Sequence, residues 1–284
     1  MTQDLQGKVF LVTGATEGIG KAAAMDFARR GATLTIVGRN REKTERVLSE
    51  LKSASGNANV DFLLGDLSSI QDIRAVAEAF KARRPKLDVL VNNAGAVFMD
   101  HRTSVDGLEM TFALNHVGYF LLTHLLSHVL EATPGSRVVN TSSGAHQVGR
   151  LELATVARRP DRSAGFTAYG DSKLANILFT RELARRLGGT VTVNCFHPGF
   201  VSTEFGQNNG GMLAPLVKVV GKLVARSPEK GAETLIWLAT SAEAARHNGG
   251  YFHDRRVART NARARDDKLA AGLWDLSLSV CGLA

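Results

Sequence analysis

The sequence predicts an α/β fold, a doubly wound and mainly parallel sheet of about seven strands with helices on both faces. Short apolar runs alternate with helical patterning along most of the 284 residues, and a glycine-rich turn joins the first apolar run to the first helix. Strands that alternate with helices form parallel sheets covered on both faces. No linker composition interrupts the pattern, so we expect a single domain over residues 1–284.

The expected strands are short and apolar, and they lie near residues 8–12, 33–37, 60–65, 87–92, 137–141, 190–196 and 249–252. Each strand except the last is followed by helical patterning. Ligands of such folds bind beyond the carboxyl ends of the strands. The residues that follow the strands are therefore the first candidates for a functional site.

The first strand leads into a glycine turn that is typical of dinucleotide binding. Gly14 permits the tight turn, Gly18 lets the backbone approach a pyrophosphate, and Gly20 allows the helix to pack closely over the strand. A structural glycine loop in another α/β protein is the alternative. A P-loop fits poorly because Lys21 is followed by Ala22, which has no hydroxyl for magnesium.

The end of the second strand bears on the choice of cofactor. An NAD enzyme usually has an acid there for the ribose hydroxyls, whereas an arginine accommodates a 2′-phosphate. This chain has Arg39 and no acid at the strand end, so NADP(H) is favoured over NAD(H). Glu17 opposes this interpretation, since an acid near the second glycine would repel the phosphate. A solvated loop arginine is the alternative for Arg39.

Tyr169 and Lys173 are four residues apart in a segment with helical patterning, and that spacing stacks both side chains on one helix face. A lysine charge favours tyrosinate, so we expect the pKa of Tyr169 to be lowered toward neutrality. The pair taken alone is a frequent coincidence on helix surfaces. Whether Tyr169 and Lys173 are catalytic therefore depends on the other motifs in the chain.

Several motifs in a fixed order together resemble the short-chain dehydrogenase/reductases, whose fold is the doubly wound Rossmann fold. The resemblance covers about residues 7–253 and rests on Gly14-x-x-x-Gly18-x-Gly20, Asn92-Asn93-Ala94-Gly95, Asn115, Ser142-Ser143, Tyr169-x-x-x-Lys173 and Pro198-Gly199. It implies an NADP(H)-dependent oxidoreductase that interconverts a carbonyl and an alcohol by hydride transfer. The alternative is a catalytically silent NAD(P)-binding sensor or scaffold protein.

The resemblance also implies roles for single residues. Tyr169 would be the acid/base, and Ser143, in preference to Ser142, would donate to the substrate oxygen. Lys173 would lower the tyrosine pKa and bind the nicotinamide ribose, while Asn115 would hold a water linked to Lys173. The implied cofactor-binding residues are Gly14, Thr16, Glu17, Gly18, Ile19, Gly20, Arg39, Asn40, Asp66, Leu67, Asn93, Ala94, Gly95, Tyr169, Lys173, Pro198, Gly199, Val201 and Thr203.

A long gap between Ser143 and Tyr169, which contains Arg158-Arg159-Pro160-Asp161-Arg162, resembles the retinol dehydrogenase-like branch. That branch implies a lipophilic small-molecule substrate. We expect a substrate lid at about residues 200–228 and a C-terminal tail at about 254–284. The lid contains an apolar segment with a basic stripe at Lys218, Lys222 and Arg226, which would allow peripheral contact with an anionic membrane surface. A helix packed into the core is the alternative for this segment.

Composition excludes several other classes of protein. No apolar run is long enough to span a membrane, and the two cysteines provide no disulfide framework, so we expect a cytoplasmic protein. The net charge of +8 is scattered without interleaved aromatic residues, which argues against nucleic-acid binding. His124 and His128 have helical metal-ligand spacing without a supporting carboxylate or cysteine, so we expect no metal. A homo-oligomer is compatible with the sequence.

Overall fold

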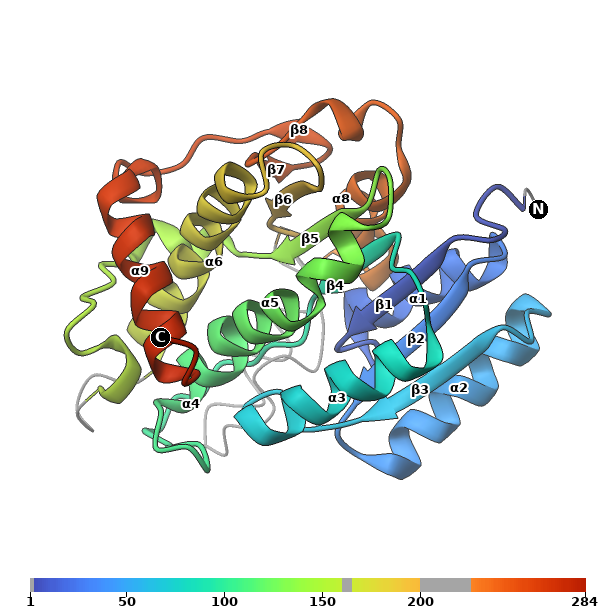
Figure 1. Cartoon of the computed structure of the whole chain (residues 1–284), viewed down its shortest axis with the longest axis horizontal. Helices are drawn as coiled ribbons and strands as arrows, with labels where there is room; N and C mark the ends of the chain where they lie inside the picture. Colours follow the sequence, from blue (N-terminus) through green and yellow to red (C-terminus); the bar gives the residue numbers. More distant parts are fainter. Residues whose placement is uncertain (1–2, 160–164, 200–225) are drawn as a thin grey trace.

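Eight strands form one sheet in the order β3-β2-β1-β4-β5-β6-β7-β8 (Figure 1). The computed structural model describes residues 3–159, 165–199 and 226–284. All neighbouring strands are parallel apart from the last pair, which is antiparallel. The strands are β1 Val9–Thr13, β2 Thr33–Gly38, β3 Val60–Leu64, β4 Val89–Asn92, β5 Arg137–Thr141, β6 Thr192–Phe196, β7 Tyr251–His253 and β8 Arg256–Val257.

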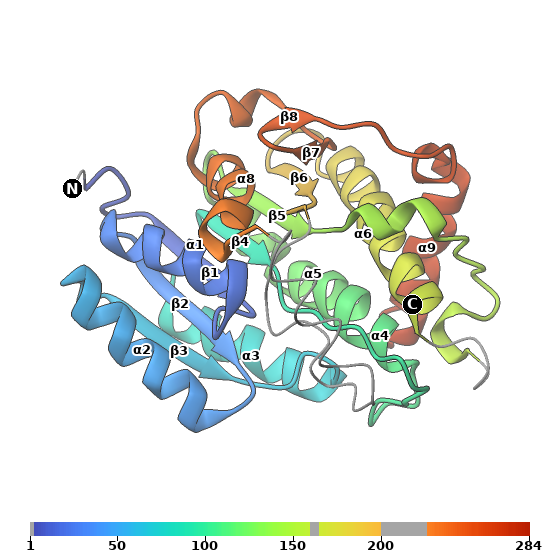
Figure 2. The ribbon, with the colours of Figure 1, turned by 180° about the vertical axis from the view of Figure 1, so that it is seen from behind.

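Helices cover both faces of this sheet, so the predicted doubly wound fold is confirmed. Figure 1 shows α3, α5, α6 and α9 on one face, and Figure 2 shows α1, α2 and α8 on the other. The helices are α1 Gly18–Arg29, α2 Arg41–Ser55, α3 Ile70–Arg83, α4 Met110–Phe112, α5 Gly118–Glu131, α6 Phe166–Arg186, α8 Pro228–Thr240 and α9 Asp267–Val280, with a π-helical turn, η1, at Ala113–Val117.

Polar side chains fix where several helices begin. Asn40 accepts a hydrogen bond from the first turn of α2, and Ser69 and Asp266 do the same for α3 and α9. Ser227 caps α8, whose first residue is Pro228. These caps satisfy amide groups that a helix cannot bond internally, and proline is well suited to the first helical position.

Successive strands are added on one side of β1 first and then on its other side. The chain adds β2 and β3 on one side and then crosses to β4 on the other, so Leu11 of β1 lies between Thr35 of β2 and Leu90 of β4. In folds of this kind the two halves of the sheet diverge at such a point and leave a crevice beyond the carboxyl ends of the strands. The ends of β1 and β4 therefore mark the place where a dinucleotide binds in such folds.

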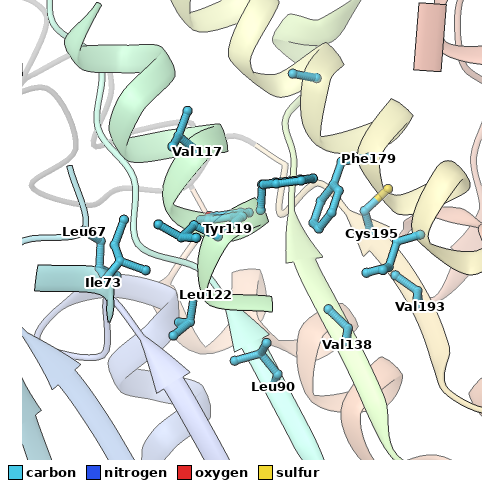
Figure 3. Packing of buried hydrophobic residues seen from close by; sticks show 14 of the residues in the cluster. Leu67, Ile73, Leu90, Val117, Tyr119, Leu122, Val138, Phe179, Val193 and Cys195 are labelled. Atoms are coloured by element: carbon cyan, nitrogen blue, oxygen red, sulfur yellow. The ribbon is translucent and has the colours of Figure 1, made fainter. Parts of the chain in front are cut away.

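Each face of the sheet has its own buried apolar cluster. On the face covered by α5 and α6, Leu90, Val138 and Val193 extend from neighbouring strands toward Leu122 and Phe179 (Figure 3). Complete burial of such a side chain stabilises the fold by about 1.5–3 kcal/mol. The cluster fixes α5 and α6 against the sheet, and these two helices hold most of the polar site described below.

The C-terminal segment, which the sequence suggested only as a tail, contains the two-residue strand β8 and the helix α9. Trp274 of α9 lies with its ring 5.0 Å from that of Phe120 on α5 and 6.2 Å from that of Phe179 on α6. The segment is thus part of the packed core on that face. Among the residues that the structure describes, no helix combines the length and the apolar character that a membrane span needs.

Candidate active site

The turn after β1 packs directly against the turn after β4. Gly14 has φ of +65°, and a Cβ atom there would lie 2.6 Å from Cα of Ala94. A Cβ on Gly20 would overlap the carbonyl of Gly14 and the side chain of Asn93. Both positions therefore need glycine, one for its backbone angle and both for the close approach. The result is an open cradle of backbone at the N-terminus of α1, as the motif predicts.

Thr13 holds these two turns together, although the sequence analysis did not single it out. Its hydroxyl accepts hydrogen bonds from the backbone amides of Asn93 (2.9 Å) and Ala94 (3.1 Å). The side-chain amide of Asn93 donates to the carbonyl of Gly14 at 3.0 Å. Asn93, Ala94 and the glycine turn thus form one rigid edge of the crevice.

A second part of the crevice lies beyond β2 and β3. This pocket is lined by Arg39, Asn40, Leu64, Gly65, Asp66 and Asp72. Asp66 accepts hydrogen bonds from the amide (2.9 Å) and the hydroxyl (2.7 Å) of Ser68, while the adjacent Leu67 is buried in the core. The pocket therefore combines one exposed cation with fixed hydrogen-bonding groups.

Glu17, which the sequence analysis set against phosphate binding, forms an ion pair with Lys43 of α2. Thr16, Glu17 and Ile19 lie on or beside the glycine turn, and Ile19 packs against the core. The ion pair offsets the negative charge of Glu17 at the crevice. Lys43 was missed because its proximity to Glu17 depends on how α2 packs beside α1.

Asn115 lies in the π-helical turn η1 and is completely buried. Its side chain accepts a hydrogen bond from the amide of Ala96 (2.9 Å) and donates to the carbonyl of Ala96 (2.9 Å) and to the hydroxyl of Ser172 (3.0 Å). Its backbone carbonyl accepts from the side chain of Asn176 at 2.9 Å. Asn115 thereby joins the loop after β4 to helix α6.

Tyr169 and Lys173 lie one turn apart on α6, as their spacing predicts. Tyr169 is 9% exposed and Lys173 is 2% exposed. The ammonium group of Lys173 donates to the carbonyl of Thr141 at 3.3 Å and lies 5.6 Å from the ring centroid of Tyr169. The phenol and the lysine therefore meet at the carboxyl end of β5.

Burial dominates the electrostatics of this pair. It raises the pKa of Tyr169 to about 12, and a hydrogen bond with Ser143 opposes the shift. Burial also lowers the pKa of Lys173 to about 7. The expected lowering of the tyrosine pKa is therefore wrong, because the loss of hydration on burial is the largest influence on the phenol and disfavours its charged form.

The two serines after β5 have different environments. The hydroxyl of Ser142 is buried and donates to the carbonyl of Lys173 at 2.8 Å. Ser143 is half-buried, accepts a hydrogen bond from the amide of Ala145 at 3.2 Å, and bonds to Tyr169 closely enough to oppose the rise in its pKa. The geometry therefore brings Ser143 to the tyrosine and assigns Ser142 a structural bond.

The arginine-rich insertion is anchored to α6 beside this cluster. Asp171 is almost fully buried, forms an ion pair with Arg159, and accepts hydrogen bonds from the amides of Arg150 (2.6 Å) and Leu151 (2.9 Å). Asp171 follows Tyr169 by two residues, so the insertion is anchored within one helical turn of the phenol. The described part of the insertion is thus fixed to the start of α6, on a different side of the helix from the Tyr169 side chain.

The remaining predicted residues follow β6. Pro198 and Gly199 come directly after the strand, and the amide of Gly199 donates to His197 at 3.2 Å. Gly95 lies by the lysine, since a Cβ there would be 3.4 Å from the ammonium nitrogen of Lys173. Val201, Thr203, Lys218, Lys222 and most of the expected lid at 200–228 lie outside the described residues. Arg226, at the end of that segment, forms an ion pair with Asp254.

Three site residues on helices α5 and α6 escaped the sequence analysis, namely Tyr119, Ser172 and Asn176. Ser172 and Asn176 share one helical stripe with Tyr169 and Lys173, because the four positions follow an i, i+3, i+4, i+7 pattern. That stripe is the signal that could have identified them. Tyr119 had no such signal, since it belongs to a different helix and resembles an ordinary core residue.

Comparison with known proteins agrees with this architecture. Residues 8–213 match the short chain dehydrogenase family. Retinol dehydrogenase 11 of Homo sapiens is 41% identical over 283 residues, which cover 99% of this chain and 88% of that protein. Dehydrogenase/reductase SDR family member 13 of Bos taurus is 41% identical over 285 residues, which cover 98% of this chain and 74% of that protein.

Solved structures with the same architecture include an uncharacterized protein from Mycobacterium paratuberculosis, with a TM-score of 0.80, 29% identity, and coverage of 99% of this chain and 97% of that chain. A short chain dehydrogenase from Burkholderia cenocepacia J2315 in complex with NADP has a TM-score of 0.68 and 26% identity. The match covers 87% of this chain and 96% of that chain. The chain therefore belongs to the short chain dehydrogenase family, in its retinol dehydrogenase-like branch, and is an oxidoreductase of alcohol and carbonyl groups.

Proposed function

We propose that the protein is an NADP(H)-dependent oxidoreductase that interconverts a carbonyl and an alcohol on a lipophilic small molecule, with Tyr169 as the acid/base. The observation that carries the proposal is the cluster of half-buried Ser143 with buried Tyr169 and Lys173 beside the glycine cradle. A proton donor, a hydroxyl donor and a cation meet there at the end of the sheet where such folds bind dinucleotides.

The chain's own residues fit a dinucleotide. The cradle at Gly14 and Gly20 has no room for side chains, so backbone amides at the start of α1 are free to face a pyrophosphate. Arg39 lines the pocket beyond β2, where its guanidinium can bind a 2′-phosphate, and Lys43 offsets Glu17 nearby. The Burkholderia relative was solved in complex with NADP. These features favour NADP(H) over NAD(H).

The proposed mechanism assigns one step to each polar group. A nicotinamide cofactor held by the glycine turn, Arg39 and Lys173 would supply or accept the hydride at the substrate carbon. In reduction, the hydroxyl of Tyr169 transfers its proton to the carbonyl oxygen, and Ser143 donates a hydrogen bond to the same atom as negative charge develops on it. Lys173 in its charged form stabilises the tyrosinate that remains. Asn115 fixes the loop after β4 and helix α6 in the arrangement that this step needs.

Exposed apolar side chains beside Tyr169 support a lipophilic substrate. Phe166 is 56% exposed, and its ring centroid lies 6.2 Å from that of Tyr169. Met99 and Val148 are each 54% exposed, and they approach Gly165 and Gly170 at the start of α6. An apolar ligand that covers these side chains removes apolar surface from water, and this burial favours binding.

A carbonyl series tests this proposal. With NADPH as the reductant, we expect kcat/KM to rise with the apolar bulk of the aldehyde or ketone, and a retinoid aldehyde to be among the best substrates. Phe166→Ser should reduce kcat/KM for bulky substrates by roughly tenfold, which corresponds to the burial of part of one aromatic side chain. Val257→Ser is the matched control, because Val257 is 67% exposed on β8 at the far edge of the sheet.

The outcomes of this series separate the competing interpretations. A preference for small or charged carbonyl compounds would contradict the lipophilic substrate. NADPH binding without turnover of any carbonyl or alcohol would instead favour the silent sensor or scaffold protein. The retained Ser143, Tyr169 and Lys173 argue for turnover, since a silent binding protein has no need of a buried acid and cation together.

A further inference from the structure

Lys173 is a buried cation without an acidic partner. Within the described ranges of the chain, no carboxylate forms an ion pair with it, and its hydrogen bond to the carbonyl of Thr141 is long at 3.3 Å. A buried ammonium group is costly unless it is compensated, and one neutral acceptor compensates it only partly. Another contribution is therefore needed if the lysine is to carry charge near neutral pH.

Two aromatic rings supply this contribution. The ammonium nitrogen lies over the ring of Tyr169 at 5.6 Å and over the ring of Tyr119 at 5.7 Å from their centroids. Both distances fall within the range in which the negative face of an aromatic ring attracts a cation. Tyr119 is on α5, one turn after Asn115, so the rings approach the lysine from two different helices.

The hydroxyl of Tyr119 does not account for the presence of tyrosine at this position. Tyr119 is 1% exposed, and within the part of the chain that the structure describes its hydroxyl forms no hydrogen bond of good geometry, although the side chain of Thr141 lies near enough to affect it. Burial raises its pKa well above the ordinary value, the neighbouring Tyr169 adds to the rise, and the side chain of Thr141 opposes it. Tyr119 is therefore neutral, and its aromatic ring is the part that can act on Lys173.

We propose that Tyr119 is a positioning residue whose ring, together with that of Tyr169, stabilises the protonated form of Lys173 and holds the ammonium group at the end of β5. This role rests on the proposed function, in which charged Lys173 stabilises the tyrosinate. It predicts that the charge state of Lys173 depends on an aromatic ring at position 119 and not on the phenolic hydroxyl.

A change in the pKa of Lys173 can be attributed to position 119 only if its other neighbours keep their charge near neutral pH. Among residues 3–159, 165–199 and 226–284, the groups that face the lysine are Tyr169 on its own helix, Tyr119 on α5, Thr141 on β5 and the backbone of Gly95 after β4. Of these, the two phenols alone titrate, and both have raised pKa values. Neither changes its charge near neutral pH, so a shift in the titration of Lys173 reports on the ring at position 119.

The test measures the titration of Lys173 in the full-length protein without cofactor, by NMR of isotope-labelled lysine, with the signal assigned by its loss in Lys173→Met. We expect a pKa near 7 in the parent protein. Tyr119→Phe should leave this value within a few tenths of a unit because the ring is retained. Tyr119→Leu should lower it by about half a unit to one unit, so that the protonated fraction above the pKa falls roughly three- to tenfold.

A second set of variants separates the ring's charge distribution from its volume. Phenylalanine with successive fluorine atoms, placed at position 119, keeps the shape of the ring while weakening its negative face. The pKa of Lys173 should fall stepwise along this series. An unchanged or raised pKa in Tyr119→Leu, or a fluorine series without a trend, would overturn the proposal and assign Tyr119 to packing.

Activity provides an independent comparison. Where turnover is measured, kcat should fall as the pH rises through the pKa of Lys173, because the lysine then loses its charge. The pH of this fall should stay near the parent value in Tyr119→Phe and should be lower in Tyr119→Leu. Thr123→Val is the matched control, because Thr123 is equally buried on α5 and accepts a hydrogen bond from Asn92 at 2.9 Å, away from the lysine. If the parent protein reduces no carbonyl compound, the proposed function fails, whereas the lysine titration still decides the role of Tyr119.

Discussion

At the scale of single residues, the burial of Tyr169 and Lys173 determines which forms are present. A tyrosine pKa of about 12 means that the hydroxyl retains its proton at neutral pH, and a lysine pKa of about 7 places its charge within reach of neutral pH. A protonated phenol is the form that carbonyl reduction needs, because it must give a proton to the developing oxyanion. Alcohol oxidation needs the tyrosinate, which this environment disfavours.

Arg39 provides a prediction at the same scale. We expect the parent protein to bind NADPH more tightly than NADH, and Arg39→Ala to lose much of the difference, by roughly tenfold in Kd, because a charge-assisted bond to the 2′-phosphate is lost. Titration of both cofactors against both proteins measures this. Arg41→Ala is the control, since Arg41 is exposed nearby and forms an ion pair with Glu45. Equal affinities of the parent protein for the two cofactors would rule this role out.

At the scale of elements, helix α6 carries most of what the sequence could predict about the site. The spacing of Tyr169 and Lys173 is a property of helix geometry, so their meeting on one face followed from the sequence. Their pKa values did not follow, because burial depends on helices and strands that are remote in sequence. The same limit explains why the contacts of Tyr119 and of Lys43, each on another helix, were missed.

The insertion before α6 provides a prediction for an element. Asp171→Asn removes the charge that pairs with Arg159 and weakens the anchor of the insertion to α6. We expect a loss of roughly 3 kcal/mol in the free energy of unfolding, since the carboxylate charge that faces the buried Arg159 guanidinium is removed. We also expect lower kcat/KM for bulky substrates with little change in cofactor affinity, because the anchor is at the start of α6, the helix that carries Tyr169, and away from Arg39.

Asp267→Asn is the matched control for that change. Asp267 also pairs with an arginine, Arg181, but its side chain is 79% exposed, so its loss should cost well under 1 kcal/mol. Chemical denaturation of the parent protein and both variants measures the difference. If Asp171→Asn unfolded at the same denaturant concentration as the parent protein, the buried pair would not be what anchors the insertion.

At the scale of the whole molecule, alternating strands and helices predicted the sheet, its two covered faces and the edge where the site lies. The seven expected strands are all present within a few residues of their predicted positions. Strand β8 was missed because Arg256 and Val257 are exposed and form only a two-residue antiparallel pair with β7. Helix α9 was missed because its apolar face has meaning only against α5 and α6, which come much earlier in the chain.

In the proposed function, this fold brings a bound cofactor and a carbonyl compound to Tyr169 for hydride transfer and protonation. The most direct measurement follows the transfer of deuterium from deuterated NADPH to a lipophilic aldehyde in single turnovers of the parent protein and of Tyr169→Phe. We expect deuterium on the carbonyl carbon with the parent protein, and unchanged NADPH affinity with a rate lower by about 10²–10⁴-fold in Tyr169→Phe. Near-parent rates in Tyr169→Phe would contradict this role of Tyr169.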